Sequence, residues 1–178
     1  MDSSYSRIMG PAYHKVQYSF KNLRKGEVRG LKGEYEVKDV VSLGSIKAMS
    51  LTRFKDSYRV MAEEEEQIAK ETFEEVSEGK SGDKRADEAI DKLKKSNVDK
   101  ETVKKAGGAL IDAFKEVSEG YRTENGLGDA ARWNVATNRM TVLQNGVQFE
   151  LYVEVSNDPG KNRETALVIA KEILKKCD

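Results

Sequence analysis

Glycines spaced as in a phosphate-binding loop stand out in the last third of the chain. Gly126, Gly128 and Ala131 fit the pattern G-x-G-x-x-A, one form of the loop that holds the pyrophosphate of a dinucleotide. That loop has to follow a strand and open a helix, because the amides at the helix N-terminus face the phosphate. Here a helical pattern ends at Gly120 before the motif, and a β-hairpin pattern follows Trp133. We therefore interpret the motif as a turn that glycine permits, and we expect no cofactor.

Three side chains beside this turn are the candidates for contact with a ligand. Asp129, Arg132 and Trp133 lie where the turn leads into a predicted sheet. A tryptophan at such a place most often packs in the core, and stacking on a ligand is its alternative role. These three residues form the predicted ligand-binding set.

Side chains that could perform catalysis or hold a metal are sparse. The only histidine is His14 and the only cysteine is Cys177, so a nucleophile paired with histidine would need residues from the ends of the chain. The acidic runs at 63–66 and 74–75 have lysines nearby, which is typical of a solvated helix face. We predict no catalytic residue and no metal site.

The composition limits the partners. The 178 residues include 31 basic and 31 acidic side chains, so no net field attracts nucleic acid, and we expect no nucleic-acid partner. The charged fraction of 35% is mostly Lys and Glu, a bias of heat-adapted organisms. No stretch approaches the roughly 18 continuous apolar residues of a membrane span, so we predict no transmembrane segment. The expected partner is an unidentified protein or small-molecule ligand.

The elements that would position the candidate residues follow from the hydrophobic period. Alternation predicts strands at 13–20 and 34–38, and a hairpin over 45–62 that turns at Lys55 and Asp56. Helical spacing predicts helices at 63–78, 84–95 and 100–119.

Two adjacent glycines, Gly107 and Gly108, interrupt the last of these helices at a cost of about 1 kcal/mol each. We interpret the pair as a sign that another element approaches closely there.

The last third of the chain has the clearest pattern. Strands at 140–144 and 147–155 flank Asn145 and Gly146, the strongest short signal for a hairpin. The second strand alternates apolar and polar residues, and an apolar helical stripe follows at 166–174. The predicted fold class is α+β, with antiparallel hairpins and helices packed on one face of the sheet.

The order of the predicted elements suggests an internal duplication. Leu43-Gly44 and Leu127-Gly128 are each followed by a predicted hairpin and a helix. The similarity leaves open whether the two halves are related or share only an order of elements. The predicted organisation is a flexible tail over 1–12 and a single α+β domain over 13–178, with pseudo-repeats at 35–79 and 121–176 joined by a helical connector at 80–120.

The run from Gly126 to Trp133, the hairpin at 140–151 and the helix at 166–174 together resemble a pattern of small extracytoplasmic prokaryotic lipoprotein domains. The resemblance covers about the last third of the chain. It implies a non-enzymatic binding or interaction module of the cell envelope, extracytoplasmic or membrane-anchored if a signal segment was trimmed. The alternative is a cytoplasmic small-molecule-binding protein or enzyme on the same scaffold.

Overall fold

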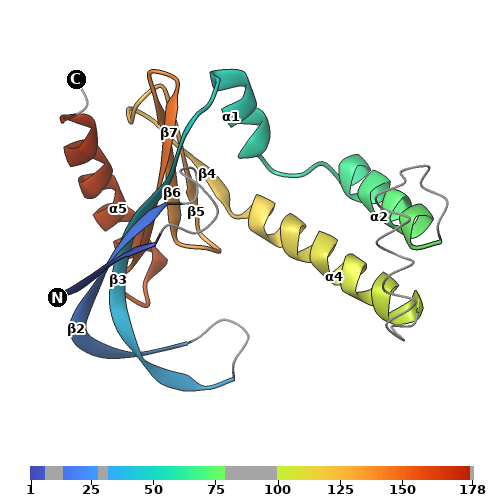
Figure 1. The fold of residues 1–178 in the computed structure, drawn as a ribbon, viewed down its shortest axis with the longest axis horizontal. Coiled ribbons are helices and arrows are strands. Elements are labelled where there is room, and N and C mark those ends of the chain that lie inside the picture. Colours follow the sequence, from blue (N-terminus) through green and yellow to red (C-terminus); the bar gives the residue numbers. More distant parts are fainter. Residues whose placement is uncertain (7–13, 28–31, 79–99, 177–178) are drawn as a thin grey trace. The chain divides into compact units, whose positions relative to one another are not determined.

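The computed structural model describes residues 1–6, 14–27, 32–78 and 100–176. The chain groups into two compact units, which are coloured by sequence in Figure 1. We call residues 1–59 and 120–178 the sheet unit, and residues 60–119 the helical unit. The fold class is α+β, as the sequence predicts.

One antiparallel sheet forms the sheet unit. Its strand order is β1-β2-β3-β7-β6-β5-β4, so β3 and β7 pair in the middle and join the two ends of the chain. Each of the other neighbouring pairs is also antiparallel, as expected for a sheet built from hairpins. The strands are β1 (Asp2–Ser6), β2 (Lys15–Glu27), β3 (Glu34–Ala48), β4 (Tyr121–Glu124), β5 (Ala130–Asn134), β6 (Arg139–Gln144) and β7 (Val147–Glu154).

The hairpin predicted at Asn145-Gly146 is confirmed. Both residues have positive φ, 49° and 74°, which a two-residue turn of the favoured type requires. After β7 the chain enters α5 (Pro159–Leu174), which covers the predicted apolar stripe. Asp158 caps this helix, since its side chain accepts a hydrogen bond from the Gly160 amide at 2.8 Å.

The hydrophobic core lies between α5 and the last three strands. Trp133 on β5, Met140 on β6 and Leu151 on β7 are each at most 1% exposed, and their strands pair directly with one another. Ala166 and Ala170 of α5 are fully buried against them. Large side chains on the sheet therefore meet small ones on the helix, which lets the two approach closely.

A helix replaces the hairpin that the sequence predicts over 45–62. The segment Leu51–Ser57 forms α1, and β3 extends to Ala48 before it. The Ser50 side chain caps α1 by accepting from the Arg53 amide, and Phe54 is fully buried. The hairpin prediction was wrong because Phe54, packed with Leu143, anchors a helical turn that alternation does not reveal.

Helices contact both sides of the sheet, so the prediction that they pack on one face was wrong. Leu143 neighbours Val142 on β6 and projects to the other side, so α1 lies on the side of the sheet opposite α5.

The first residues form an edge strand where a flexible tail was predicted over 1–12. Asp2–Ser6 makes β1, which pairs with β2 from Asp2 opposite Ser19 to Ser6 opposite Lys15. Main-chain hydrogen bonds to a neighbouring strand order this small, polar segment, and composition alone does not show them. Residues 7–12 lie outside the described residues.

The helical unit is built from α2 (Glu63–Glu78) and α4 (Lys100–Glu119), which run antiparallel. A Cβ placed on Gly107 would lie 1.9 Å from Cε1 of Phe73, so the Phe73 ring packs directly against the Gly107 backbone where the helices meet. The predicted close approach is confirmed at Gly107. An added Cβ at Gly108 would meet nothing within 4 Å.

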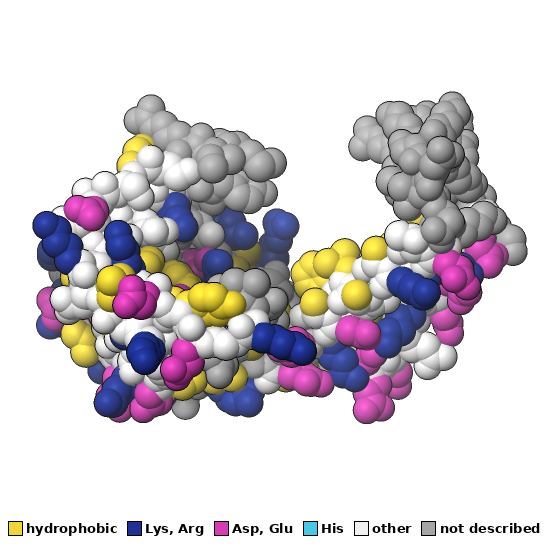
Figure 2. All heavy atoms as spheres, turned by 90° about the horizontal axis from the view of Figure 1, so that it is seen from below, with side chains coloured by type: hydrophobic (Ala, Val, Ile, Leu, Met, Phe, Trp, Pro, Cys, Tyr) yellow, Lys and Arg dark blue, Asp and Glu magenta, His cyan; other side chains and the backbone are white. Residues whose placement is uncertain are grey.

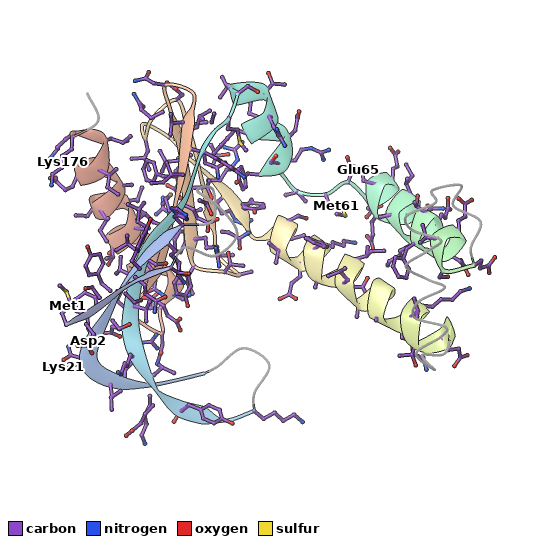
Figure 3. All side chains as sticks on the ribbon, in the orientation of Figure 1. Met1, Asp2, Lys21, Met61, Glu65 and Lys176 are labelled. Atoms are coloured by element: carbon purple, nitrogen blue, oxygen red, sulfur yellow. The ribbon has the colours of Figure 1, made fainter. Side chains whose placement is uncertain are left out.

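Hydrogen bonds fix the start of α2, where Figure 3 labels Met61 and Glu65. The Glu65 carboxylate accepts from the Ala62 amide at 3.0 Å, which is the capping-box contact. The Ser118 hydroxyl of α4 accepts from the Met61 amide at 3.0 Å. Ion pairs also link the two helices: Glu66 with Lys115, Lys70 with Asp112, and Lys104 with Glu74 and Glu78.

The surface of the helical unit is divided by side-chain type. Figure 2 shows apolar side chains gathered on one side of it and charged side chains on the other. The large apolar residues exposed on α2 and α4 are Ile68, Leu110 and Phe114.

The structure gives no support for the duplication. Segment 35–79 contains one strand followed by helices, whereas segment 121–176 contains four strands followed by one helix. Leu43-Gly44 lies inside β3, whereas Leu127-Gly128 lies in the turn between β4 and β5. The helix predicted at 84–95 lies outside the described residues.

Candidate functional site

The side of the sheet opposite α5, which we call the polar face, presents two rows of side chains across five strands. Residues directly opposite each other on antiparallel strands project to the same side. The first row is Lys15, Gly44, Glu150, Thr141 and Arg132, and the second is Gln17, Ser42, Tyr152, Arg139 and Asn134. Residues distant in sequence thus meet on this face.

A hollow of about 190 Å³ opens on the polar face at Gly44, and we call it the Gly44 hollow. Gly44 lies between Lys15 and Glu150 in the first row, and a Cβ placed on it would meet the His14 carbonyl oxygen at 3.0 Å and side-chain carbons of Lys15 at 3.4 Å. The volume is below the ~300 Å³ of the smaller drug-sized pockets, so the space suits a ligand of few atoms. The lining residues are His14, Lys15, Ser42, Gly44, Ser45, Arg139, Glu150 and Tyr152.

Arg139 is held on two sides within this hollow. Its Nη1 donates a hydrogen bond to Oε1 of Glu150. Its guanidinium carbon lies over the Tyr152 ring, 5.7 Å from the ring centroid, a distance at which cation–π attraction acts. These contacts fix the guanidinium before any ligand arrives.

Tyr152 keeps its hydroxyl proton in this setting. Burial, and then the hydrogen bond that the hydroxyl donates to Glu154, raise the pKa of Tyr152 above its usual range. The hydroxyl is therefore a neutral donor, and it links the Gly44 hollow to a neighbouring carboxylate.

Two further tyrosines lie on the same face. Tyr58 follows α1 and Tyr121 lies on β4, with their ring centroids 5.6 Å apart. Burial, followed by the charge of Glu150, raises the pKa of Tyr58 to about 12 and raises the pKa of Tyr121. The Tyr58 hydroxyl donates to Oε1 of the fully buried Gln148 at 2.9 Å.

A second hollow of about 380 Å³ lies around Arg24. All three guanidinium nitrogens of Arg24 are engaged: Nε with Asp39 at 3.0 Å, Nη2 with Glu154 at 3.2 Å, and Nη1 with Asn157. Its charge is thus matched by acceptors of the protein itself. The lining residues are Arg24, Gly26, Glu34, Asn138, Glu154, Ser156 and Asn157.

The three predicted ligand-binding residues are not brought together. Asp129 is exposed and its Oδ2 accepts from the Asn145 amide at 2.7 Å, which ties the turn to the next hairpin. Arg132 donates from Nε to the Tyr58 carbonyl at 3.0 Å, on the polar face. Trp133 is 1% exposed in the core on the other side. None of the three lines either hollow, and a binding role for them stays a prediction.

The glycine motif forms a turn between two strands, as interpreted from the sequence. Gly126 and Gly128 have φ of 72° and 61°, and β5 follows at Ala130. A Cβ at Gly128 would lie 2.4 Å from the Leu143 carbonyl oxygen, so the turn packs tightly there.

The side chains considered for catalysis or metal binding can be placed in part. Among the described residues, no group of three or more His, Cys, Asp and Glu side chains is placed to hold a metal ion. His14 lines the Gly44 hollow with its Nδ1 2.9 Å from the Tyr5 hydroxyl, whereas Cys177 lies outside the described residues. Within the described part of the chain, no helix combines the length and apolarity that crossing a membrane needs.

The group formed by Arg139, Glu150 and Tyr152 was not predicted from the sequence, although a signal for it was present. A two-residue turn at 145–146 fixes the register of its hairpin, and that register sets Arg139 opposite Tyr152. No local signal predicts that Lys15 and Gly44 lie beside this group, because their placement depends on the non-local pairing of β3 with β7.

Comparisons of the chain with models of known protein families, with curated proteins and with solved structures each returned no match.

Proposed function

We propose that the protein is a non-enzymatic binding module that takes up a small polar ligand in the Gly44 hollow. The observation that supports this most is that β2, β3, β6 and β7 all contribute residues to one hollow, with charged and hydroxyl side chains around it. Polar groups that converge on a concave space are the usual mark of a ligand site.

The arrangement suits binding because its polar groups are held in place beforehand. Arg139 is fixed by Glu150 and Tyr152, and Tyr152 is fixed by Glu154. Ser42 is 3% exposed on β3, a central strand of the sheet. Groups that are already ordered lose little conformational entropy when a ligand binds.

The resemblance of the last third to extracytoplasmic lipoprotein domains supports display of this module outside the cytoplasm. A cytoplasmic small-molecule-binding protein or enzyme stays the alternative. Fractionation of cells that express the gene with its natural upstream sequence distinguishes the two locations.

A ligand screen followed by nuclear magnetic resonance tests the proposed site. We expect small polar metabolites in a mixed library to shift the backbone amides of Gly44, Glu150 and Tyr152. Amides of α5, such as that of Lys171, serve as the control because this helix covers the other side of the sheet. The proposal fails if a broad library shifts no amide of β3, β6 or β7, or if every ligand found binds at α5 instead.

A further inference from the structure

We propose that the Gly44 hollow selects oxyanions, so that its ligand carries a carboxylate or a phosphate group. This inference rests on the proposed function, because it names the class of ligand for the same site. Three observations support it: the unused donors of Arg139, the cations across the hollow, and the contrast with Arg24.

Arg139 has N–H groups that donate to no described residue. A guanidinium has five N–H groups in a planar fork that matches the oxygens of carboxylate and phosphate. The hydrogen bond to Glu150 uses Nη1. Within the part of the chain that the structure describes, Nε and Nη2 of Arg139 have no acceptor, so they can bind a ligand without breaking an existing bond.

Arg24 shows what a saturated guanidinium looks like in the same sheet. Each of its three nitrogens has an acceptor, and Asp39 and Glu154 neutralise its charge. An anion at Arg24 would have to displace a carboxylate of the protein. The hollow at Arg139 is therefore the better oxyanion site, although the hollow at Arg24 is larger.

The charges around the Gly44 hollow favour an anion. Lys15 and Arg139 are cationic, and Glu150 is the single carboxylate among the described residues of the lining. Lys15 makes no ion pair with any described residue. An oxyanion in the hollow can therefore lie near the positive charges of both Arg139 and Lys15, because both side chains line the hollow.

Titration of the labelled full chain with simple probes tests the inference. The probes are sodium phosphate and sodium acetate as oxyanions, choline chloride as a cation and glucose as a neutral ligand, all at constant ionic strength because salt screens charges. We expect saturable shifts of the Arg139 Nε–H and of the Gly44 amide with one or both oxyanions. The phosphate and acetate arms show which of the two groups the site prefers.

Variants that remove one charge test whether positive charge in the hollow strengthens oxyanion binding and negative charge weakens it. Arg139→Gln should weaken oxyanion binding by about tenfold or more, as expected for the loss of charge-assisted hydrogen bonds. Glu150→Gln removes the one negative charge and should tighten binding by about threefold. Lys171→Gln on α5 removes a positive charge from the other side of the sheet and should change nothing. If Arg139→Gln fails to fold, Lys15→Gln and Glu150→Gln still show whether positive charge strengthens oxyanion binding.

The possible failures are distinguishable. Saturable binding of choline or glucose at these residues, without binding of either oxyanion, overturns the oxyanion inference and leaves the proposed binding function intact. Unchanged oxyanion binding in both Arg139→Gln and Lys15→Gln also overturns it, because neither cation would then recognise the ligand. If none of the four probes shifts Gly44 or Arg139, the oxyanion inference is wrong, and the broad library decides the proposed function.

Discussion

The two sides of one strand show how differently the two faces of the sheet are built. On β5, Trp133 is 1% exposed and packs among apolar side chains under α5. Its neighbour Arg132 projects to the polar face and donates to the Tyr58 carbonyl. One residue along the strand changes the surroundings from close-packed carbon to hydrogen bonds and charge.

This difference indicates that the two faces of the sheet unit have different roles. The face under α5 provides most of the stability, because burial of apolar area there is extensive and close-packed. Away from the Phe54–Leu143 cluster at α1, the exposed ion pairs of the polar face each contribute little, so those side chains can be changed more freely. The polar face is therefore the better place for a binding site, because side chains can change there at less cost to the free energy of unfolding.

The largest expected effect comes from Trp133→Ala. We expect it to lower the free energy of unfolding by about 3–5 kcal/mol, because it leaves a cavity in a packed core. Urea unfolding monitored by circular dichroism measures the loss. Arg132→Ala is the control on the same strand, and we expect it to cost about 1–2 kcal/mol through the hydrogen bond to Tyr58. Equal losses for the two variants would contradict the division between the faces.

The C-terminal hairpin and α5 could be predicted because their signals are local. The turn at Asn145-Gly146 needs positive φ at both residues, and the alternation along β7 needs only the identity of each side chain. Gln148 marks the limit of this pattern. It lies on the polar face, yet it is fully buried, and its side chain accepts a hydrogen bond from Tyr58.

The region from β2 to α1 could be predicted only in part: alternation found segments of β2 and β3, whereas their full length and α1 depend on contacts distant in sequence. β2 and β3 run for 13 and 15 residues as partners, well beyond the short alternating segments at 13–20 and 34–38. The helix α1 is held by the burial of Phe54 against Leu143, about ninety residues away along the chain. Tyr58 reaches the polar face only through that unpredicted helix.

The second prediction compares two carboxylate–arginine pairs, one on each face. Glu124 lies opposite Ala131 on the side under α5, where its carboxylate accepts from Arg163 at 2.5 and 2.6 Å and is 5% exposed. Glu150 accepts from Arg139 on the polar face and is 19% exposed.

We expect Glu124→Gln to cost about 1.5–3 kcal/mol, because a charge-assisted pair with a buried carboxylate is lost. Glu150→Gln should cost less than about 1 kcal/mol, as measured for exposed pairs. Thermal and urea unfolding of the two variants side by side measure both. A larger loss for Glu150→Gln would show that the polar face contributes more to folding than the comparison implies.

The smallest expected effect concerns pH and the Tyr58 hydroxyl. Burial and the charge of Glu150 raise the pKa of Tyr58 from 10.0 to about 12 in the folded protein. Folding therefore favours the protonated hydroxyl, so Tyr58 contributes a stability that is fully present below pH 10.0 and is lost as the pH rises through about 12.

The stability of the wild type relative to Tyr58→Phe should be constant below pH 10 and should fall above it. Unfolding of both proteins in urea across this range gives the difference, in which the titration of lysines and the other tyrosines largely cancels. A difference that stays constant through the whole range would mean that Tyr58 is as solvated when folded as when unfolded, and that the polar face is open even beside α1.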